Sequence, residues 1–397
     1  MTTFLSVVAS ELFLRLWFPL YASPYQPDDV VLVRLVPGAR KVFTRFAING
    51  GQRIISQINS QGFRGEELRP ADHLRRVIVY GDSNVQAEFS ELGDTFPKQL
   101  EKRLEPRLGV PVEVVNAGVV GYGPDQVSMR LPGELAWLKP ALVVVVVFAD
   151  NDFGDLIRNR IYSLNARGDL ELNRYQLAPE MRARLQRASH PRGLARLQLA
   201  RYAYRLWQLI RVRRIGQSSS GEEGSLSHYI DDSLARSQSD FRDYMVDTGV
   251  HIAADPFEDP YDADIAVHPD WPSSRYKAAL MEKVLLRLRD TVAVRSVPLV
   301  LVILPAAIDA CDHYELQVNS REYPQYDRTR LSALVEQIAA RNGILHLNLW
   351  DAFHANGVCY YFHGGDDHWN DAGQAKAAQL LSDLIVRGGL LAEPRPP

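Results

Sequence analysis

The 397-residue sequence has only two cysteines, Cys311 and Cys359, which excludes a disulfide-rich scaffold and a zinc module built on several cysteines. It also lacks a strong excess of charge, since 45 Lys and Arg stand against 48 Asp and Glu. That balance gives no general attraction to nucleic acid or to an anionic membrane. The remaining composition, 46% hydrophobic and 23% charged, is typical of a globular protein that buries a sizeable core.

A long uninterrupted apolar run is missing as well. The segment from Phe4 to Leu20 is rich in Phe, Leu, Val and Trp, but Glu11 and Arg15 interrupt it. Its longest apolar stretch is too short to span a bilayer, which needs about 20 residues. It has neither the basic start nor the small-residue cleavage site of a signal peptide. Two interpretations of residues 1–27 stay open: the remnant of a membrane anchor whose true start lies further upstream, or an amphipathic helix packed on the domain.

Residues 28–75 are predicted to form a β-rich segment ahead of the main domain. Residues Val30 to Val36 are expected to be extended. Two further extended stretches, 41–48 and 52–58, flank Asn49-Gly50-Gly51. Because Asn-Gly supplies the positive φ that a tight turn needs, this pattern predicts a hairpin.

From Arg76 the pattern alternates between strand and helix, which predicts a doubly wound α/β sheet of about five strands. Continuous apolar runs such as Leu142 to Val147 lack alternation, as expected for parallel strands buried on both faces. The predicted strands are Val77–Tyr80, Val112–Asn116, Ala141–Phe148, Leu299–Leu304 and Ile344–Leu347. The predicted helices are Thr95–Leu104, Asp125–Leu138, Ser274–Arg289 and Thr329–Arg341, and an apolar helix that runs to Val386.

The third and fourth strands lie about 150 residues apart, far more than one crossover helix requires. Residues 157–272 are therefore predicted to be a long helical insertion, which divides the core into residues 76–156 and 273–392. The insertion contains a basic stretch from Arg192 to Arg214, a flexible-looking Ser218 to Ser225 and an Asp/Pro-rich loop from Asp255 to Pro272. The arginines would meet an anionic glycan or lipid headgroups, although such a stripe is more often the solvated face of a helix.

Four polar segments follow predicted strands or open the last helix, and the first is Gly81-Asp82-Ser83-Asn84. It places the Ser83 hydroxyl at the carboxyl end of a strand, where open α/β sheets bind ligands. A helix-compatible segment, 85–89, follows it. Two interpretations remain: Ser83 is a nucleophile, or it is the N-cap of a tight βα turn.

The second segment runs from Asn116 to Gly123, and its glycines let the backbone approach a ligand closely. It lacks the Lys-Ser/Thr of a phosphate loop and the spacing of a dinucleotide-binding motif. The third segment, Phe148-Ala149-Asp150-Asn151-Asp152, ends an apolar strand with three polar side chains. These are costly to bury unless they face a polar crevice. Asn151 suits an oxyanion donor, and an ordinary Asx turn is the alternative.

The fourth segment, Gly364 to Gly373, contains Asp366-Asp367-His368. A histidine beside carboxylates can act as a general base whose cationic form one of them stabilises. The alternative is a capped helix start with a solvated histidine. A metal site formed by His363, Asp366 and His368 is a weaker hypothesis, because no other strand end offers His or Cys in a clear pattern.

Together these segments resemble the SGNH (GDSL-type) hydrolase superfamily over residues 76–155 and 295–390. The resemblance implies esterase or acyltransferase activity on a flavodoxin-like sheet. It implies Ser83 as nucleophile, His368 as base, and an oxyanion hole made by the N–H groups of Ser83 and Gly121 and the amide of Asn151.

The family's last motif is usually Asp-x-x-His, but Gly365 stands three residues before His368. Asp366 is therefore the expected acid, in an Asp-x-His spacing that resembles bacterial polysaccharide O-acetyltransferases, and Asp367 is the weaker candidate because adjacent side chains diverge. Ala149 replaces the glycine of the third motif.

The resemblance predicts a serine esterase acting on carboxylic esters, with acetylated carbohydrate as the favoured substrate class. An O-acyltransferase that modifies an envelope or secreted glycan is the first alternative, and an inactive glycan-binding relative is the second. No cofactor, metal or nucleic-acid partner is expected. An exported or membrane-associated location is favoured, with membrane association through the N-terminus. Cys311 and Cys359 are expected on the rim of the site, where a disulfide is a hypothesis conditional on export.

Overall fold

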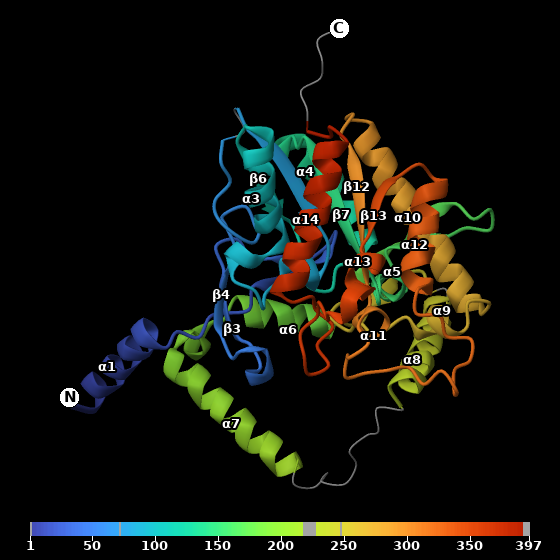
Figure 1. Ribbon diagram of the computed structural model, residues 1–397. Helices are drawn as coiled ribbons and strands as arrows, with labels where there is room; N and C mark the ends of the chain where they lie inside the picture. Colours follow the sequence, from blue (N-terminus) through green and yellow to red (C-terminus); the bar gives the residue numbers. More distant parts are fainter. Residues whose placement is uncertain (1, 71–72, 217–227, 247, 392–397) are drawn as a thin grey trace.

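The computed structural model describes residues 2–70, 73–216, 228–246 and 248–391 (Figure 1). At its centre is a five-stranded parallel sheet with the strand order β13-β12-β7-β5-β6. The strands are β5 (Arg75–Tyr80), β6 (Val112–Asn116), β7 (Leu142–Ala149), β12 (Leu299–Pro305) and β13 (Leu345–Asn348). The predicted doubly wound α/β fold with about five strands is confirmed.

The strand order places the ligand crevice. Numbered along the chain within this sheet, the order is 2-1-3-4-5, which is the flavodoxin-like arrangement. The chain leaves the first strand, β5, toward one side and later returns to place the third, β7, on its other side. Open sheets of this kind bind ligands outside the carboxyl ends of the strands at this switch point. Residues that directly follow β5 and β7 therefore face the same crevice.

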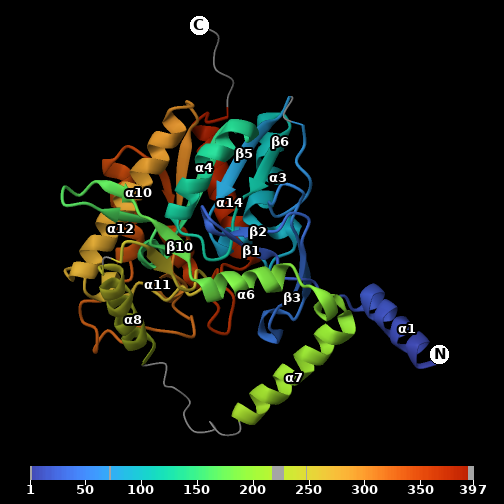
Figure 2. The ribbon, with the colours of Figure 1, turned by 180° about the vertical axis from the view of Figure 1, so that it is seen from behind.

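Helices cover both faces of the sheet (Figures 1 and 2). α3 and α14 pack together on one face, and α4, α10 and α12 pack on the other. Their bounds are α3 (Phe96–Leu108), α4 (Pro124–Leu138), α10 (Pro272–Ala293), α12 (Arg330–Arg341) and α14 (Asp371–Arg387). Every residue of β7 and β12 is buried, which accounts for their unbroken apolar sequence. Short helices follow several strands, namely α2 (Ser83–Gln86), η2 (Leu92–Asp94), α5 (Asp152–Asn159), α11 (Ala307–Ala310), α13 (Trp350–His354) and η4 (Ala355–Gly357).

The segment ahead of the core forms two antiparallel hairpins. β1 (Tyr25–Asp28) pairs with β2 (Leu32–Leu35), and β3 (Arg40–Thr44) pairs with β4 (Arg53–Gln57). The second hairpin is the predicted one, but its turn is wider than expected, because a 3-10 turn, η1 (Ala47–Asn49), lies between the strands. Gly50 and Gly51 both adopt positive φ, so the Asn-Gly-Gly signal marks the reversal even though the turn is not a two-residue one.

The insertion is less purely helical than predicted. It holds two small sheets, an antiparallel pair β8 (Tyr162–Leu164) and β9 (Leu170–Leu172), and a parallel pair β10 (Tyr175–Leu177) and β11 (His251–Ala253). Its helices are α6 (Pro179–Ser189), η3 (Gly193–Arg196), α7 (Gln198–Gly216), α8 (His228–Tyr244) and α9 (Ala263–Val267). The stretch Ser218 to Ser225 lies outside the described residues.

The N-terminal segment forms one helix, α1 (Thr2–Trp17), as the sequence predicts. The expectation that it packs on the domain is wrong, because α1 projects from the body and contacts α7 (Figures 1 and 2). Most of its described side chains are exposed. Within the described residues, no helix combines the length and apolar character that crossing a membrane requires.

Candidate active site

Ser83 lies directly beyond the carboxyl end of β5, at the switch point of the sheet. It opens α2, a single helical turn that ends where Ala87 adopts a left-handed conformation with φ 51°. The helix-compatible segment 85–89 is therefore helical only as far as Gln86, and a turn of this length contributes little helix dipole. Only 8% of the Ser83 surface is exposed. The Ser83 side chain is thus nearly buried at this edge of the sheet.

Asp82, and not Ser83, caps this turn. The Asp82 carboxylate accepts a hydrogen bond from the Asn84 backbone N–H at 2.9 Å and another from the Asn84 side chain at 3.2 Å. The interpretation of Ser83 as an N-cap residue is therefore wrong, and the turn keeps its shape without the serine hydroxyl. Burial raises the pKa of Asp82, while the nearby His368 opposes the rise.

Trp369 joins the serine turn to the histidine loop. Its backbone N–H donates to the Asn84 side-chain oxygen at 3.1 Å, and its indole N–H donates to the Asn84 carbonyl at 2.8 Å. Trp369 is almost fully buried. Because Asn84 and Trp369 are the neighbours of Ser83 and His368 in the chain, these two bonds hold both residues at one place. Sequence reasoning did not single out Trp369, although a bulky apolar residue amid polar neighbours was a signal.

The imidazole of His368 is oriented by carboxylates. Its Nδ1 lies 2.8 Å from Asp366 Oδ1, which also accepts the His368 backbone N–H at 3.0 Å. Since a carboxylate only accepts, Nδ1 donates and Nε2 is left as the basic nitrogen. The expectation that the Asp367 side chain diverges is wrong, because its Oδ1 lies 3.3 Å from the same Nδ1. The structure therefore gives His368 two carboxylate neighbours, with Asp366 the closer.

These carboxylates make His368 strongly basic. Burial lowers its pKa, but the hydrogen bond to Asp366 and the charges of Asp367, Asp366 and Asp82 outweigh burial and raise the pKa to about 10. Burial also raises the pKa of Asp367, which the neighbouring Asp366 and Asp82 raise further. The imidazolium is thus the favoured form at neutral pH.

The loop that carries Gly121 packs against the serine turn. The Val119 N–H donates to the Gly81 carbonyl at 3.1 Å, and the Val120 N–H donates to the Gln86 side chain at 2.8 Å. Gly121 has φ 75°, and a Cβ added there would stand 2.0 Å from the Pro256 carbonyl oxygen. Glycine is therefore required at this position, both for its backbone conformation and for the close approach of the insertion.

Asn151 follows β7 and lies on the same side of the sheet as Ser83, as predicted. Its backbone carbonyl accepts from the Asp155 N–H, which begins α5. Its side chain is buried, and its Oδ1 has no hydrogen-bond partner among the described residues. The side-chain oxygen of Asn151 therefore has no structural hydrogen bond within the described residues. The neighbouring Asp150 Oδ1 is also buried without such a partner.

The insertion supplies a wall of the crevice that sequence reasoning missed. The Asp262 N–H donates to the Asp150 carbonyl at 2.7 Å, and the Asp262 carboxylate is fixed by the fully buried Lys277 at 2.6 Å. The charges of Asp367 and His368 act on Asp259, which lies three residues before this anchor. Burial and the charge of Asp367 raise the pKa of Asp259 to about 6. The Asp/Pro-rich composition of this loop was the only signal in the sequence.

The tip of the histidine loop is held by Glu315. The carboxylate of Glu315 accepts the Gly364 N–H at 2.9 Å, and its Oε1 lies 3.4 Å from Nδ1 of His363. Gly365 adopts φ 76°, a conformation that disfavours the aspartate usual at this position in Asp-x-x-His. Asp366, Asp367 and His368 have donor atoms within 4.8 Å of one another, and His363 does not belong to this group. The metal site predicted from His363, Asp366 and His368 is therefore not assembled.

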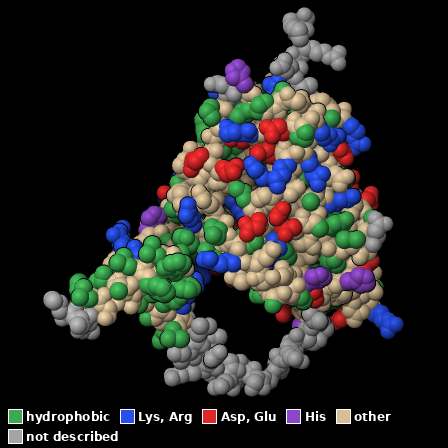
Figure 3. All heavy atoms as spheres, turned by 60° about the vertical axis from the view of Figure 1, so that its left-hand side comes forward, with side chains coloured by type: hydrophobic (Ala, Val, Ile, Leu, Met, Phe, Trp, Pro, Cys, Tyr) green, Lys and Arg blue, Asp and Glu red, His purple; other side chains and the backbone are tan. Residues whose placement is uncertain are grey.

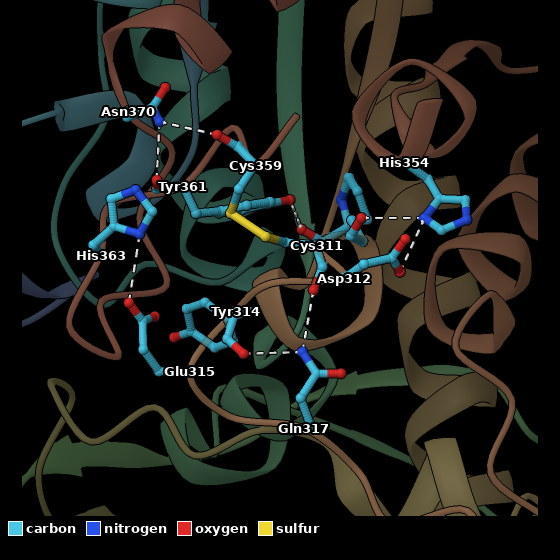
Figure 4. The surroundings of a disulfide bond; sticks show 12 residues. Cys311, Asp312, Tyr314, Glu315, Gln317, His354, Cys359, Tyr361, His363 and Asn370 are labelled. Carbon is cyan, nitrogen blue, oxygen red and sulfur yellow. Dashed lines mark hydrogen bonds and ion pairs between the residues drawn. A yellow bond between two sulfur atoms is a disulfide. The ribbon is translucent and has the colours of Figure 1, made fainter. Parts of the chain in front are cut away.

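Cys311 and Cys359 form a disulfide at the base of the histidine loop (Figure 4). Cys311 directly follows α11, and Cys359 precedes the loop that carries His368. The side chain of Asn370 donates to the carbonyls of Cys359 and Tyr361, and the Tyr361 hydroxyl donates to the Pro305 carbonyl. The hypothesis of a disulfide on the rim of the site is confirmed. The loop is thus tied at its base to the end of β12.

Removing the disulfide is expected to lower the free energy of unfolding. The two cysteines are separated by 48 residues, and closing a loop of that length in the unfolded chain corresponds to about 4 kcal/mol. Urea unfolding of a Cys311→Ser/Cys359→Ser variant measures the loss. As a control, a reductant should destabilise the wild type and leave the double variant unchanged. Equal stability of oxidised wild type and double variant would contradict the prediction.

Comparison with known proteins adds little to this geometry. No family model and no curated protein sequence matches the chain. Among solved structures, TesA is 14% identical, with a TM-score of 0.38 over 80% of this chain and 100% of its own. An acetyl xylan esterase, AlAXEase, is 13% identical, with a TM-score of 0.36 over 78% and 99%. A catalytic mutant of the Geobacillus stearothermophilus acetylxylan esterase Axe2 is 11% identical, with a TM-score of 0.37 over 79% and 94%. TM-scores of this size carry no conclusion about function.

Proposed function

We propose that this protein is a serine esterase that hydrolyses carboxylic esters, with acetyl esters of a carbohydrate as the substrate class. The observation that carries the proposal is the pair of hydrogen bonds from Trp369 to Asn84, which brings the Ser83 turn and the His368–Asp366 pair together at the switch point. A serine, a histidine and a carboxylate carried by neighbouring segments are the parts from which a nucleophilic triad is built.

The chemistry follows from these roles. Nε2 of His368 accepts the Ser83 proton as the Ser83 oxygen attacks the ester carbonyl, and Asp366 stabilises the imidazolium that forms. The tetrahedral intermediate collapses when the imidazolium gives this proton to the departing alcohol, which leaves an acyl group on Ser83. Water, deprotonated by His368, then attacks the acyl carbonyl and releases the carboxylic acid and free Ser83.

The negative oxygen of the intermediate needs donors that are already in place. The backbone N–H groups of Ser83 and Gly121 and the side-chain amide of Asn151 are the donors in this proposal. The support is the position of Asn151, which is buried directly after β7 at the same edge of the sheet as Ser83. The loop contacts that bring Gly121 to the serine turn support the second backbone donor. Donors held in place before the reaction stabilise developing charge without reorganising.

Replacing Asn151 by alanine is expected to lower kcat about 10²- to 10³-fold, because one oxyanion donor is lost. KM should change little, since the donor acts on charge that is absent from the substrate's ground state. Initial rates on an activated acetyl ester measure both constants. Asn165, on the distant β8–β9 hairpin, provides a matched Asn→Ala control that should retain wild-type rates. A loss confined to KM would contradict the role of Asn151.

The pKa of His368 predicts an alkaline rise in activity. Below about pH 10 the imidazole is protonated and cannot accept the Ser83 proton. We therefore expect kcat/KM to increase about ten-fold per pH unit from neutral pH toward pH 10. Asp367→Asn removes a charge that raises this pKa, so its ascending limb should move to lower pH. A pH profile that is flat above pH 7 in the wild type would contradict the prediction.

The charge and size of the crevice support a neutral substrate with a small acyl group. The charges of Asp82, Asp150, Asp259 and Asp367 act on one another. An anionic substrate would add to this repulsion. The small exposed surface of Ser83 supports a short acyl chain. The charges of Asp150, Asp259 and Asp367 also act on Tyr229, from α8 of the insertion, and its ring is the aromatic surface that we propose for a sugar.

An acetyl-transfer assay tests the proposal against its alternatives. The protein is incubated with an activated acetyl ester, with and without a neutral oligosaccharide acceptor, and free acetate and acetylated sugar are measured. Acetate as the main product in both reactions supports the esterase. Acetyl on the sugar in place of acetate would make the protein an O-acyltransferase that uses the same acyl-enzyme. No turnover, with sugar binding retained, would make it an inactive glycan-binding relative. The disulfide supports an exported location, because such bonds persist in oxidising compartments.

A further inference from the structure

A two-helix arm extends from the domain beside the β3–β4 hairpin (Figures 1 and 2). We define the arm as residues 2–21 and 190–207, which comprise α1, the 3-10 turn η3 and the first half of α7. The two segments are about 180 residues apart in the sequence and contact each other in the structure. The arm takes no part in the crevice around Ser83, so a role for the arm is independent of the proposed esterase activity.

Hydrogen bonds hold the two segments of the arm together. Both carboxylate oxygens of Glu11 accept backbone N–H groups at the start of α7, from Gln198 at 2.9 Å and Leu199 at 3.0 Å. Burial opposes ionisation, but these bonds and the neighbouring Arg15 outweigh it and lower the pKa of Glu11. The side chain of Gln198 in turn bonds both the N–H and the carbonyl of Leu20. The acidic residue that interrupts the apolar segment thus joins α1 to α7.

The outer surface of the arm is apolar and exposed. Leu16 is 76% exposed, Phe4 is 72% exposed and Trp17 is 69% exposed. Figure 3 shows hydrophobic side chains gathered over this part of the molecule, with basic side chains where it meets the body. The exposed large hydrophobic residues of the arm are Phe4, Leu5, Val7, Val8, Leu12, Phe13, Leu16, Trp17, Phe18, Tyr21, Leu194, Tyr204, Leu206 and Trp207. A contiguous apolar surface of this kind marks a site of association.

Positive charge accompanies the apolar surface. Within the arm as defined, Arg15, Arg192, Arg196, Arg201 and Arg205 stand against a single acidic residue, Glu11, which is engaged at the start of α7. A groove of about 540 Å³ lies where the arm joins the body. Trp17, Phe18, Tyr21 and Tyr202 line it together with Lys41, Arg53 and Arg205, and no acidic side chain does. Aromatic rings beside cations are typical of protein surfaces at the level of lipid headgroups.

We infer that the arm is a docking surface for an anionic lipid bilayer. The apolar side chains of α1 and α7 enter the boundary between headgroups and acyl chains, and the arginines bind the lipid phosphates. A second copy of the chain is disfavoured as the occupant, because it would bring two arginine-rich arms together. An anionic bilayer offers an apolar interior to the exposed hydrophobic side chains and negatively charged headgroups to the arginines.

Vesicle flotation of the full-length protein tests the inference. The vesicles are phosphatidylcholine alone or phosphatidylcholine with about one-third phosphatidylglycerol. We expect binding to the anionic vesicles to be more than about ten-fold tighter, and to weaken as salt rises from about 0.1 M to about 0.5 M. Emission from Trp17 and Trp207 should shift to shorter wavelength on binding.

Two arm variants separate the apolar and charged contributions. Phe13→Ser/Leu16→Ser removes exposed apolar surface, and Arg192→Glu/Arg205→Glu reverses exposed charge. Each should weaken binding to anionic vesicles more than about ten-fold. The matched control is Leu172→Ser/Val294→Ser, which removes equally exposed apolar side chains from the body and should bind as the wild type does. Thermal melting of each variant checks that the fold is retained.

Three results would overturn the inference. The first is no binding of the wild type to anionic vesicles. The second is an equal loss of binding in the arm variants and in the body control. The third is a wild-type dimer in light scattering that the arm substitutions dissociate, without any binding to vesicles, which would assign the surface to a second copy of the chain.

Discussion

Replacing Ser83 by alanine is expected to lower kcat on an acetyl ester by at least about 10⁴-fold, because no acyl-enzyme can form without the hydroxyl. The fold should be unaffected, since Asp82 caps the turn and the Ser83 side chain is not its cap. Substrate binding should persist, because the crevice walls and the oxyanion donors remain. Steady-state rates, together with the thermal melting temperature, measure the two effects separately.

Ser382 provides the matched control for this substitution. It is a buried serine on α14 whose hydroxyl donates to the Gln379 carbonyl, and it has no part in the site. Ser382→Ala should keep wild-type rates even if it costs some stability. A Ser83→Ala protein that melts like the wild type and turns over at more than about a tenth of its rate would remove the serine from the mechanism.

Replacing Asp366 by asparagine is expected to lower kcat by about 10⁴-fold. An amide in place of the carboxylate can donate to Nδ1, which would place the proton on Nε2 and leave no base facing Ser83. It would also leave the imidazolium without its closest counter-charge. Steady-state kinetics at the pH optimum of each protein measure the loss.

Asp367→Asn distinguishes the two carboxylates beside His368. Asp367 Oδ1 is 3.3 Å from Nδ1, against 2.8 Å for Asp366, and it makes no contact with the His368 backbone N–H comparable to that of Asp366. We therefore expect Asp367→Asn to lower kcat by less than about ten-fold and to act mainly on the pH profile. A larger loss in Asp367→Asn than in Asp366→Asn would exchange their roles.

The sheet could be predicted because its strands carry a local signal. The runs that form β7 and β12 are apolar at every position, and only central parallel strands require that. The bounds of the five predicted strands differ from the observed ones by at most two residues at either end. Helix ends were less accurate, as α3 continues through Pro106 to Leu108, four residues beyond the predicted end at Leu104.

The wall of the crevice could not be predicted, because it depends on contacts between distant segments. The loop that carries Asp259 is fixed where the Asp262 N–H bonds the Asp150 carbonyl and Lys277 bonds the Asp262 carboxylate, and no local pattern encodes that pairing. The approach of the Pro256 carbonyl to Gly121 is of the same kind. The candidate triad was found because its members lie at strand and helix ends, where polar residues interrupt apolar patterns.

The position of α1 shows the limit of reasoning from apolar content. The apolar segment was expected to be either the remnant of a membrane anchor or an amphipathic helix packed on the domain. In the structure, α1 is joined to α7 through Glu11, a residue whose role depends on the N-terminus of another helix. The turn after Ser83 also depends on a distant residue. The helix ends after one turn, at Gln86, and the Arg64 guanidinium donates hydrogen bonds to the carbonyls of Gln86 and Ala87.

Covalent labelling is the most direct test of Ser83 as the nucleophile. The wild type and the Ser83→Ala variant are treated with a fluorophosphonate, digested and analysed by mass spectrometry. We expect one phosphonyl adduct per chain, on the peptide that carries Ser83, in the wild type alone. Labelling should become faster as pH rises, because His368 must lose its proton before it can accept that of Ser83. An unlabelled wild type, or an adduct on another residue that persists in Ser83→Ala, would show that Ser83 is not the nucleophile.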